Sequence, residues 1–175
     1  MEVKLDGLDK VLAVLHPDVY KKSLSRTINN IGDKARTQMV KSVGQQYNMK
    51  ASELKKFIQF RKSRYSNLEY VIDVRSKRFN AMRFAPKKLK QKGKMSVLIK
   101  KDGGRKVFKS AVFTAKNGAL LRRKGNTQEI VPVQTVSIPQ MFNKKILKET
   151  DDMVVNEFAS KFQSNFNFYI GNVKK

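Results

Sequence analysis

Apolar residues recur every three or four positions near both ends of this chain and every second position between them. This change of period constrains the fold most, because a helix and a half-buried strand need different spacings of their apolar side chains. The first helical stripe follows Pro17 and consists of Tyr20, Leu24, Ile28, Ile31, Ala35, Met39, Val43 and Tyr47. It predicts a helix about 40 Å long, with Asp18 as its N-cap.

Gly32 lies in the middle of this predicted helix. A glycine weakens a helix interior by about 1 kcal/mol relative to alanine, but it also allows a bend or close packing. The opposite face carries lysines mixed with Ser, Asn and Gln, which indicates a structural helix with one face on the core.

A second helical stripe lies near the C-terminus. It consists of Phe142, Ile146, Thr150, Val154, Phe158, Phe162 and Phe166, and is widened by Leu147 and Val155. Four phenylalanines on one stripe are more typical of a core than of a ligand site, so we expect a second long helix followed by a tail over 167–175. Shorter helices are predicted at 7–15 and at 51–57.

Between the helices the spacing is that of strands. Apolar residues alternate with others from Leu68 to Val74, and further strand candidates are 95–101, 106–115, 119–123 and 130–138. Asn117-Gly118 is the strongest hairpin signal, and Asp102-Gly103-Gly104 and Gly125-Asn126 supply two more turns. Pro132 lacks the N–H that a sheet needs, so the last segment is predicted to be an edge strand.

These elements predict an α+β fold with a long N-terminal helix, an antiparallel β-meander of four to five strands and a long C-terminal helix. The chain has 175 residues, enough for one domain with a proper core. We expect a single domain over 1–175. It would comprise a short helix at 1–17, a helical region at 18–58, a basic meander at 59–138, and a helix with its tail at 139–175.

Positive charge is concentrated in one part of the chain. The formal net charge is +24, from 38 Lys and Arg against 14 Asp and Glu. Residues 77–124 contain 17 of the basic residues and a single acid, so two-thirds of the net charge lies in 48 consecutive positions. Such a field attracts polyanions, either nucleic acid or a strongly acidic protein surface.

The densest basic run predicts an exposed, mobile loop at 86–94. Three interpretations are open: a solvated loop with no specific role, an arm that faces phosphates, or a docking site for an acidic protein. The candidate DNA- or partner-binding residues are Lys87, Lys88, Lys90, Lys92, Lys94, Arg122, Arg123 and Lys124.

Residues for catalysis are scarce. The chain has no cysteine and one histidine, His16, which excludes disulfides, thiolate metal sites and any site that needs two imidazoles. Asp151 and Asp152 are adjacent and therefore point to different parts of a helix surface. We expect a non-enzyme without metal or cofactor. Since no apolar run approaches a membrane span, we also expect no membrane partner.

Three stretches of the chain carry a resemblance to a known family. They are Ser23 to Asn30 with its continuation to Tyr47, the lysine-rich run after Arg83-Phe84, and the series from Lys106-Val107-Phe108 through Leu121-Arg122-Arg123 to Ser137-Ile138-Pro139-Gln140-Met141-Phe142. In the order of these segments, the chain resembles the minor tail protein Z family of tailed phages and prophages. These are the tail-completion proteins. The order is a basic loop, an aromatic strand, an arginine-bearing strand and a proline-ended strand before the last helix.

The resemblance implies a structural virion protein that completes the head-proximal end of the tail for head–tail joining. It implies several copies in a ring, with the tail terminator, tail tube or head–tail connector as partners. The location would be the tail or neck of the virion, and the host cytoplasm during assembly. The basic loop would then face the phosphates of the genome end or an acidic neighbouring ring. The alternatives are a free, sequence-nonspecific nucleic-acid-binding protein and a small basic nuclease or toxin that uses His16.

Overall fold

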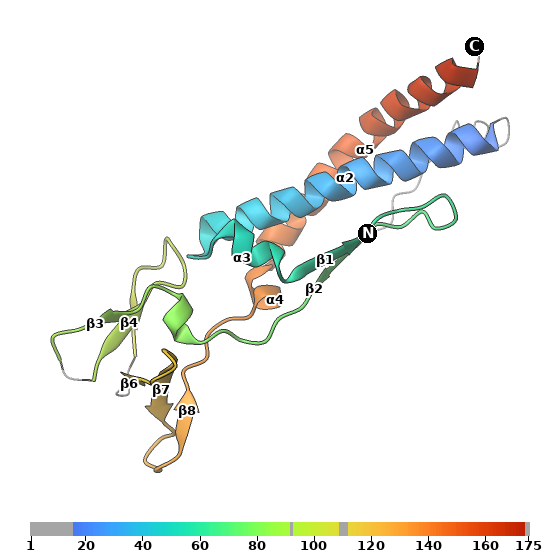
Figure 1. The fold of residues 1–175 in the computed structure, drawn as a ribbon. Coiled ribbons are helices and arrows are strands. Elements are labelled where there is room, and N and C mark those ends of the chain that lie inside the picture. Colours follow the sequence, from blue (N-terminus) through green and yellow to red (C-terminus); the bar gives the residue numbers. More distant parts are fainter. Residues whose placement is uncertain (1–15, 92, 109–111, 174–175) are drawn as a thin grey trace. The chain divides into compact units, whose positions relative to one another are not determined.

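The computed structural model describes residues 16–91, 93–108 and 112–173, so the helix predicted at 7–15 lies outside the described residues. Figure 1 shows the helices and strands in chain order. They are α2 (Pro17–Gln46), α3 (Ala51–Lys55), β1 (Ile58–Arg61), β2 (Val71–Val74), the 3-10 helix η1 (Ala81–Arg83), β3 (Lys87–Lys88), β4 (Met95–Val97), β5 (Lys106–Val107), β6 (Val112–Thr114), β7 (Leu120–Arg123), β8 (Ile130–Pro132), α4 (Ile138–Met141) and α5 (Lys144–Val173).

The predicted α+β class is confirmed, with a long helix at each end and antiparallel strands between. Over the described ranges, the strands form three small sheets, in the orders β1–β2, β3–β4–β5 and β6–β7–β8. The predicted strand at 106–115 is thereby divided between β5 and β6, which belong to different sheets.

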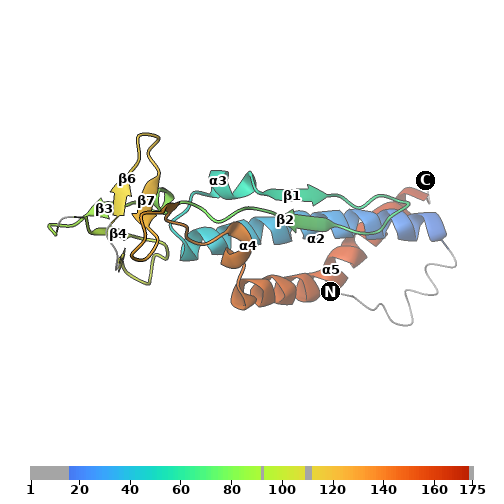
Figure 2. The same ribbon diagram turned by 90° about the horizontal axis from the view of Figure 1, so that it is seen from below.

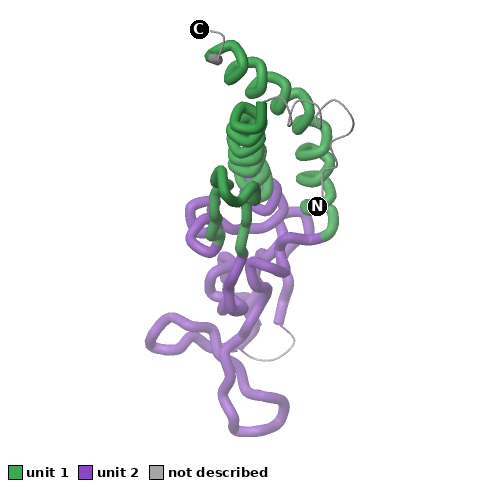
Figure 3. Tube along the Cα trace, turned by 90° about the vertical axis from the view of Figure 1, so that its right-hand side faces the viewer, with its two compact units in different colours: residues 1–39, 58–73, 144–175 green, residues 40–57, 74–143 purple. Residues whose placement is uncertain are grey.

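The chain divides into two compact units, each assembled from segments distant in the sequence (Figure 3). The first unit contains residues 1–39, 58–73 and 144–175, and the second contains 40–57 and 74–143. Helix α2 therefore contributes its first part to one unit and its end to the other. Sheets β3–β5 and β6–β8 belong to the second unit.

In the first unit the apolar stripes of the two long helices pack against each other. Val19 and Ile31 of α2 form one buried cluster with Phe158, Phe162 and Phe166 of α5. Within the same contact, the buried amide of Asn165 donates a hydrogen bond to Thr27 Oγ1 at 2.9 Å. This bond satisfies a polar group inside an otherwise apolar contact.

The β1–β2 hairpin covers the other side of α2, so that α2 lies between the hairpin and α5 (Figure 2). The side chain of Asn29 bonds Ser63 twice, donating to its carbonyl at 3.0 Å and accepting from its N–H at 2.8 Å. Arg36 stands 3.8 Å from the centroid of the Phe60 ring. At 3.6 residues per turn, Asn29 and Arg36 share a face of α2 that is opposite Ile31.

The beginning of α2 differs from the prediction. The helix begins at Pro17, a residue that fits the first helical position because its fixed φ suits the helix and its missing N–H is not needed there. Asp18 therefore lies in the first turn and is not the N-cap, and its carboxylate accepts a hydrogen bond from the Tyr65 hydroxyl. This bond ties the loop between β1 and β2 to the start of α2.

The C-terminal helix also differs in three places. It continues to Val173, where the sequence predicted a tail, because Tyr169 and Ile170 pack against the phenylalanine cluster. Leu147 and Val155, predicted to widen the buried stripe, are 43% and 58% exposed. Phe142 follows α4 as its C-cap and is not part of α5.

Turn chemistry was predicted well in the second unit. Gly118 has φ +81° in the β6–β7 hairpin, and Gly125 has φ +56° in the β7–β8 hairpin. Strand β8 is an edge strand, as Pro132 predicted, but it ends there instead of at Ile138. Ser137 instead forms a capping box with Gln140 that starts α4, so Pro139 lies in a helix.

Candidate polyanion-binding surface

The lysine-rich segment is a β-hairpin in its first part, not a loop throughout. Lys87 pairs with Ser96 and Lys88 with Met95, which makes β3 an edge strand of the β3–β4–β5 sheet. The turn closes with a bond from the Leu89 N–H to the Lys94 carbonyl at 3.0 Å. The prediction of a mobile loop at 86–94 was therefore wrong at residues 87 and 88. The buried strand β4 offers a hydrogen-bonding edge there, and lysines suit an exposed edge strand.

The side chains of this hairpin point in several directions. Lys87 and Lys88 are neighbours in a strand, so they lie on opposite faces of the sheet, and both are exposed. Lys90 is exposed in the turn. Over the described ranges, Lys87, Lys88 and Lys90 form no ion pair, while Lys92 lies outside these ranges. Their charge is therefore not neutralised within the described part of the chain.

Arg105 holds this hairpin to the segment before it. Its Nε donates to Ser96 Oγ at 3.0 Å, and its Nη2 donates to the carbonyls of Ser96, at 3.1 Å, and Ala85. Ala85 has φ +43°, in the left-handed region that a residue with a Cβ rarely adopts. Nothing in the sequence distinguishes Arg105 from the other basic residues, and only the structure shows that it supports the backbone.

The second basic cluster is divided by its own sheet. Arg122 pairs with Val112 and Val131, whereas Arg123 pairs with Ile130, so the two arginines lie on opposite faces of β7. Lys124 Nζ is 3.0 Å from a carboxylate oxygen of Glu129 across the hairpin turn. The run that looked like one basic turn in the sequence therefore presents two arginines in opposite directions and a lysine that is already paired.

One backbone bond joins the two predicted clusters. The Val112 N–H donates to the Gly93 carbonyl at 2.8 Å, and Val112 is also the strand partner of Arg122. The end of the lysine hairpin therefore lies beside the strand pair that carries Arg122. The predicted residues exposed on the two sheets that this bond joins include Lys87, Lys88, Lys90 and Arg122, with Lys87 and Lys88 on opposite faces of their sheet and Lys90 in its turn. We call these four residues the basic surface.

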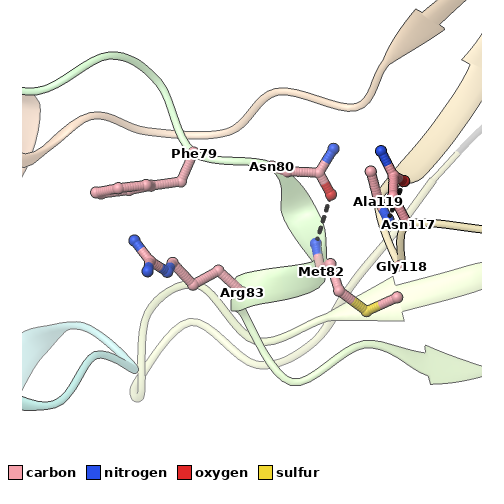
Figure 4. Close-up of a pocket in the computed structure, with 7 residues that line it drawn as sticks. All are labelled: Phe79, Asn80, Met82, Arg83, Asn117, Gly118 and Ala119. Carbon is pink, nitrogen blue, oxygen red and sulfur yellow. Dashed lines mark hydrogen bonds between the residues drawn. The ribbon is translucent and has the colours of Figure 1, made fainter. Parts of the chain in front are cut away.

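A shallow hollow of about 380 Å³ lies in the same unit, between η1 and the β6–β7 hairpin (Figure 4). The Asn80 side chain lines it, but its oxygen accepts from the N–H groups of Met82 and Leu120, at 3.0 and 2.9 Å. Arg83 stands 4.7 Å from the centroid of the Phe79 ring and 4.0 Å from a Glu53 carboxylate oxygen. The polar groups of this hollow therefore hold the local structure together.

The remaining sequence candidates are placed at surfaces. The His16 side chain is exposed at the start of α2, and the residue's carbonyl accepts from the Tyr20 N–H at 2.9 Å. Within the described residues, no three His, Cys, Asp or Glu side chains are grouped so that they could hold a metal ion. Among the helices described, none has the length and apolar character to cross a membrane.

Comparisons of this chain with protein-family models, with curated proteins and with solved structures found no match. Functional assignment therefore depends on the residues, the charge and the geometry described above.

Proposed function

We propose that this chain is a structural protein of a tailed phage or prophage that completes the head-proximal end of the tail for head–tail joining. In this role the basic surface contacts phosphates of the genome end. The proposal is supported by the resemblance of the sequence to the tail-completion family in the order of its segments, and by the positive charge of residues 77–124. No catalytic step is part of it.

The basic surface is the observation on which the DNA contact depends. Lys87, Lys88 and Arg122 are exposed on two small antiparallel sheets joined through Gly93 and Val112, and Lys90 is exposed in the adjoining turn. The three lysines have no carboxylate partner among the described residues. Cations held on strands attract the DNA backbone without reading base sequence. Each phosphate contact releases counterions, so binding should weaken steeply as salt is added.

A charge-matched pair of variants tests the DNA contact. In the first, the eight predicted residues Lys87, Lys88, Lys90, Lys92, Lys94, Arg122, Arg123 and Lys124 are replaced by Gln. In the control, the eight exposed lysines replaced by Gln are Lys22, Lys41, Lys50, Lys55, Lys56, Lys144, Lys148 and Lys161. We expect the first variant to show a much flatter dependence of duplex binding on salt than the control, at equal net charge. Equal curves for both variants would overturn the DNA contact.

The role in the particle needs a separate experiment. Deleting the reading frame from the phage or prophage that encodes the chain should leave filled heads and finished tubes that do not join, as seen by electron microscopy. Supplying the chain in trans should restore joined particles. Normal particles without the chain would overturn the tail-completion role and favour a free nucleic-acid-binding protein.

A further inference from the structure

The β6–β8 sheet buries apolar residues on one face and exposes apolar residues on the other. Val112, Leu120 and Val133 on one side are nearly inaccessible to solvent. On the other side, Phe113 and Ile130 are 42% and 53% exposed. The register aligns Phe113, Leu121 and Pro132 in one row across the three strands, with Arg123 beside Ile130 in the next row. We call these five residues the sheet face.

Helix α5 carries a stripe of complementary chemistry. Leu147, Asp151 and Val155 follow at intervals of four residues, so they lie on one side of the helix. We call these three residues the α5 stripe. All three are exposed, although Leu147 and Val155 are apolar.

The acids of this stretch differ from most others in the chain. Asp151 and the adjacent Asp152 have no ion pair or hydrogen bond from their side chains to any described residue. Other described acids bond a basic side chain or a phenol, namely Asp18, Asp33, Glu53, Glu69, Glu129, Glu149 and Glu157. In a chain with 38 basic residues, an unpaired acid pair flanked by exposed apolar residues is available for a basic partner.

We propose that the α5 stripe of one copy docks on the sheet face of a second copy, with Asp151 opposite Arg123. The inference rests on the proposed function insofar as it treats the chain as an assembling protein. From Leu147 to Val155 the helix rises about 12 Å, and three strands span about 10 Å, so two helical turns match the width of the sheet face. The apolar ends of the stripe then cover the row formed by Phe113, Leu121 and Pro132.

Charge favours a second copy in this orientation. Two sheet faces placed against each other would oppose Arg123 with Arg123, which like-charge repulsion disfavours. Because the two docking surfaces differ, each copy can bind one neighbour through its sheet and another through its helix. Such head-to-tail contacts produce a ring where the rotation closes and a filament where it does not.

The contact is small. Two helical turns on three short strands bury much less than the roughly 800 Å² per partner of a stable complex. We therefore expect single copies in dilute solution, and assembly where copies are concentrated on a common support such as the end of a tail tube.

The absence of cysteine from the chain makes the contact directly testable. Single-cysteine variants Ile130→Cys and Val155→Cys, mixed at high concentration under mild oxidation, should give covalent heterodimers. The matched control pairs Ile130→Cys with Ser160→Cys, an exposed position on a different side of α5. We expect at least a fivefold excess of the 130–155 heterodimer over the 130–160 heterodimer. Equal yields would overturn the proposal.

A double variant with both cysteines separates contact between copies from contact within one chain. Head-to-tail docking predicts a ladder of covalent oligomers, whereas an internal contact gives a cross-linked monomer only and would overturn the proposal.

Charge reversal adds a second test in the single-cysteine background. Adding Arg123→Asp to the Ile130→Cys copy, or Asp151→Arg to the Val155→Cys copy, should reduce the heterodimer yield several-fold. Mixing the two charge-reversed copies should restore the yield.

Failure of this inference is distinguishable from failure of the proposed function. Replacing Lys87, Lys88 and Lys90 by Gln changes the DNA contact and should leave the 130–155 cross-link unchanged. If the cross-link fails while deletion of the chain still leaves heads and tails unjoined, only the subunit contact is wrong. If the cross-link forms while particles join without the chain, only the tail-completion role is wrong.

Discussion

Gly32 of α2 lies directly against the ring of Tyr70, so close that a Cβ at position 32 would be 2.3 Å from Tyr70 Cγ. The ring cannot easily move away. It stacks on Phe60 with 8° between the ring planes, and its hydroxyl donates to Asp33 at 2.7 Å. The glycine that weakens the helix by itself is therefore the residue that allows the β1–β2 hairpin to pack on it.

Gly32→Ala should destabilise the protein, although alanine is the better helix former. Overpacking of this kind costs about 1–3 kcal/mol of the free energy of unfolding. Gly44→Ala in the same helix is the control, because no atom lies within 4 Å of a Cβ built there. That change should stabilise by about 0.5–1 kcal/mol. Denaturant unfolding measures both variants, and a Gly32→Ala protein as stable as the Gly44→Ala protein would contradict the packing.

Tyr70 should make stability depend on alkaline pH. Burial and the hydrogen bond to Asp33 raise the pKa of Tyr70 from 10.0 to about 12. Because the folded pKa is the higher one, the folded state retains the proton that the unfolded chain loses. This contribution is complete below pH 10 and is lost as pH rises from 10 to about 12. Lysine deprotonation affects the wild type and Tyr70→Phe alike, so the difference between their unfolding free energies should shrink over that range.

Asp33 should have the opposite pH dependence. Burial alone would raise the pKa of Asp33, but hydrogen bonds from Lys62 and Tyr70 hold it below 3.8. Stability from this group is present above pH 3.8 and is lost as pH falls further. Thermal unfolding of the wild type and Asp33→Asn should converge in acid. A constant difference down to the lowest pH would indicate that the carboxylate is not held by these bonds.

Arg105 should contribute more to stability than the neighbouring Lys106, although each carries one positive charge. Arg105→Gln removes the donors to Ser96 and Ala85, and we expect a loss of about 1–3 kcal/mol. The neighbouring Lys106→Gln removes the same charge from an exposed position without such bonds. In thermal unfolding, Arg105→Gln should melt at a lower temperature than Lys106→Gln, while duplex binding should weaken to a similar extent in both variants. Equal melting temperatures would show that Arg105 is not needed by the hairpin.

Lys124 and Arg122 should differ in DNA binding despite being close in the sequence. Arg122 is exposed in the basic surface, whereas Lys124 is paired with Glu129. If Arg122 contacts one phosphate, Arg122→Gln makes the plot of the log binding constant against log salt concentration less steep by about 0.9. Lys124→Gln should change this slope much less. Titration of a short duplex at several salt concentrations measures both. A larger effect at Lys124 would contradict the assignment of the surface.

Much of the fold could be predicted because some elements depend on local patterns. The stripes that contain Ile31 and Phe162 predicted α2 and α5, since helical spacing alone decides which side chains can share a core. Asn117-Gly118 predicted the β6–β7 hairpin because the turn needs a residue that adopts positive φ. The division of 106–115 into β5 and β6 could not be predicted, because each part pairs with a different distant strand.

The candidate surface was predicted in composition and not in geometry. Lys87, Lys88 and Lys90 are exposed, as the lysine-rich run predicted. No local pattern indicated that Arg122 and Arg123 point apart or that Glu129 pairs with Lys124, since strand register and turn closure set both. The exposure of Leu147 and Val155 was also missed, because helical spacing shows which residues share a face but not which faces are covered.

By itself, the sequence determined the helices, the main turns and the position of the charge along the chain, because each follows from neighbouring residues. Only the tertiary structure decided that Gly32 is a packing site, that Arg105 supports the backbone at Ala85, and that α5 leaves an acidic and apolar stripe exposed. These properties depend on segments tens of residues apart meeting in space. Contacts between distant segments are set by the packing of the whole chain, and they cannot be predicted from any short stretch of the sequence.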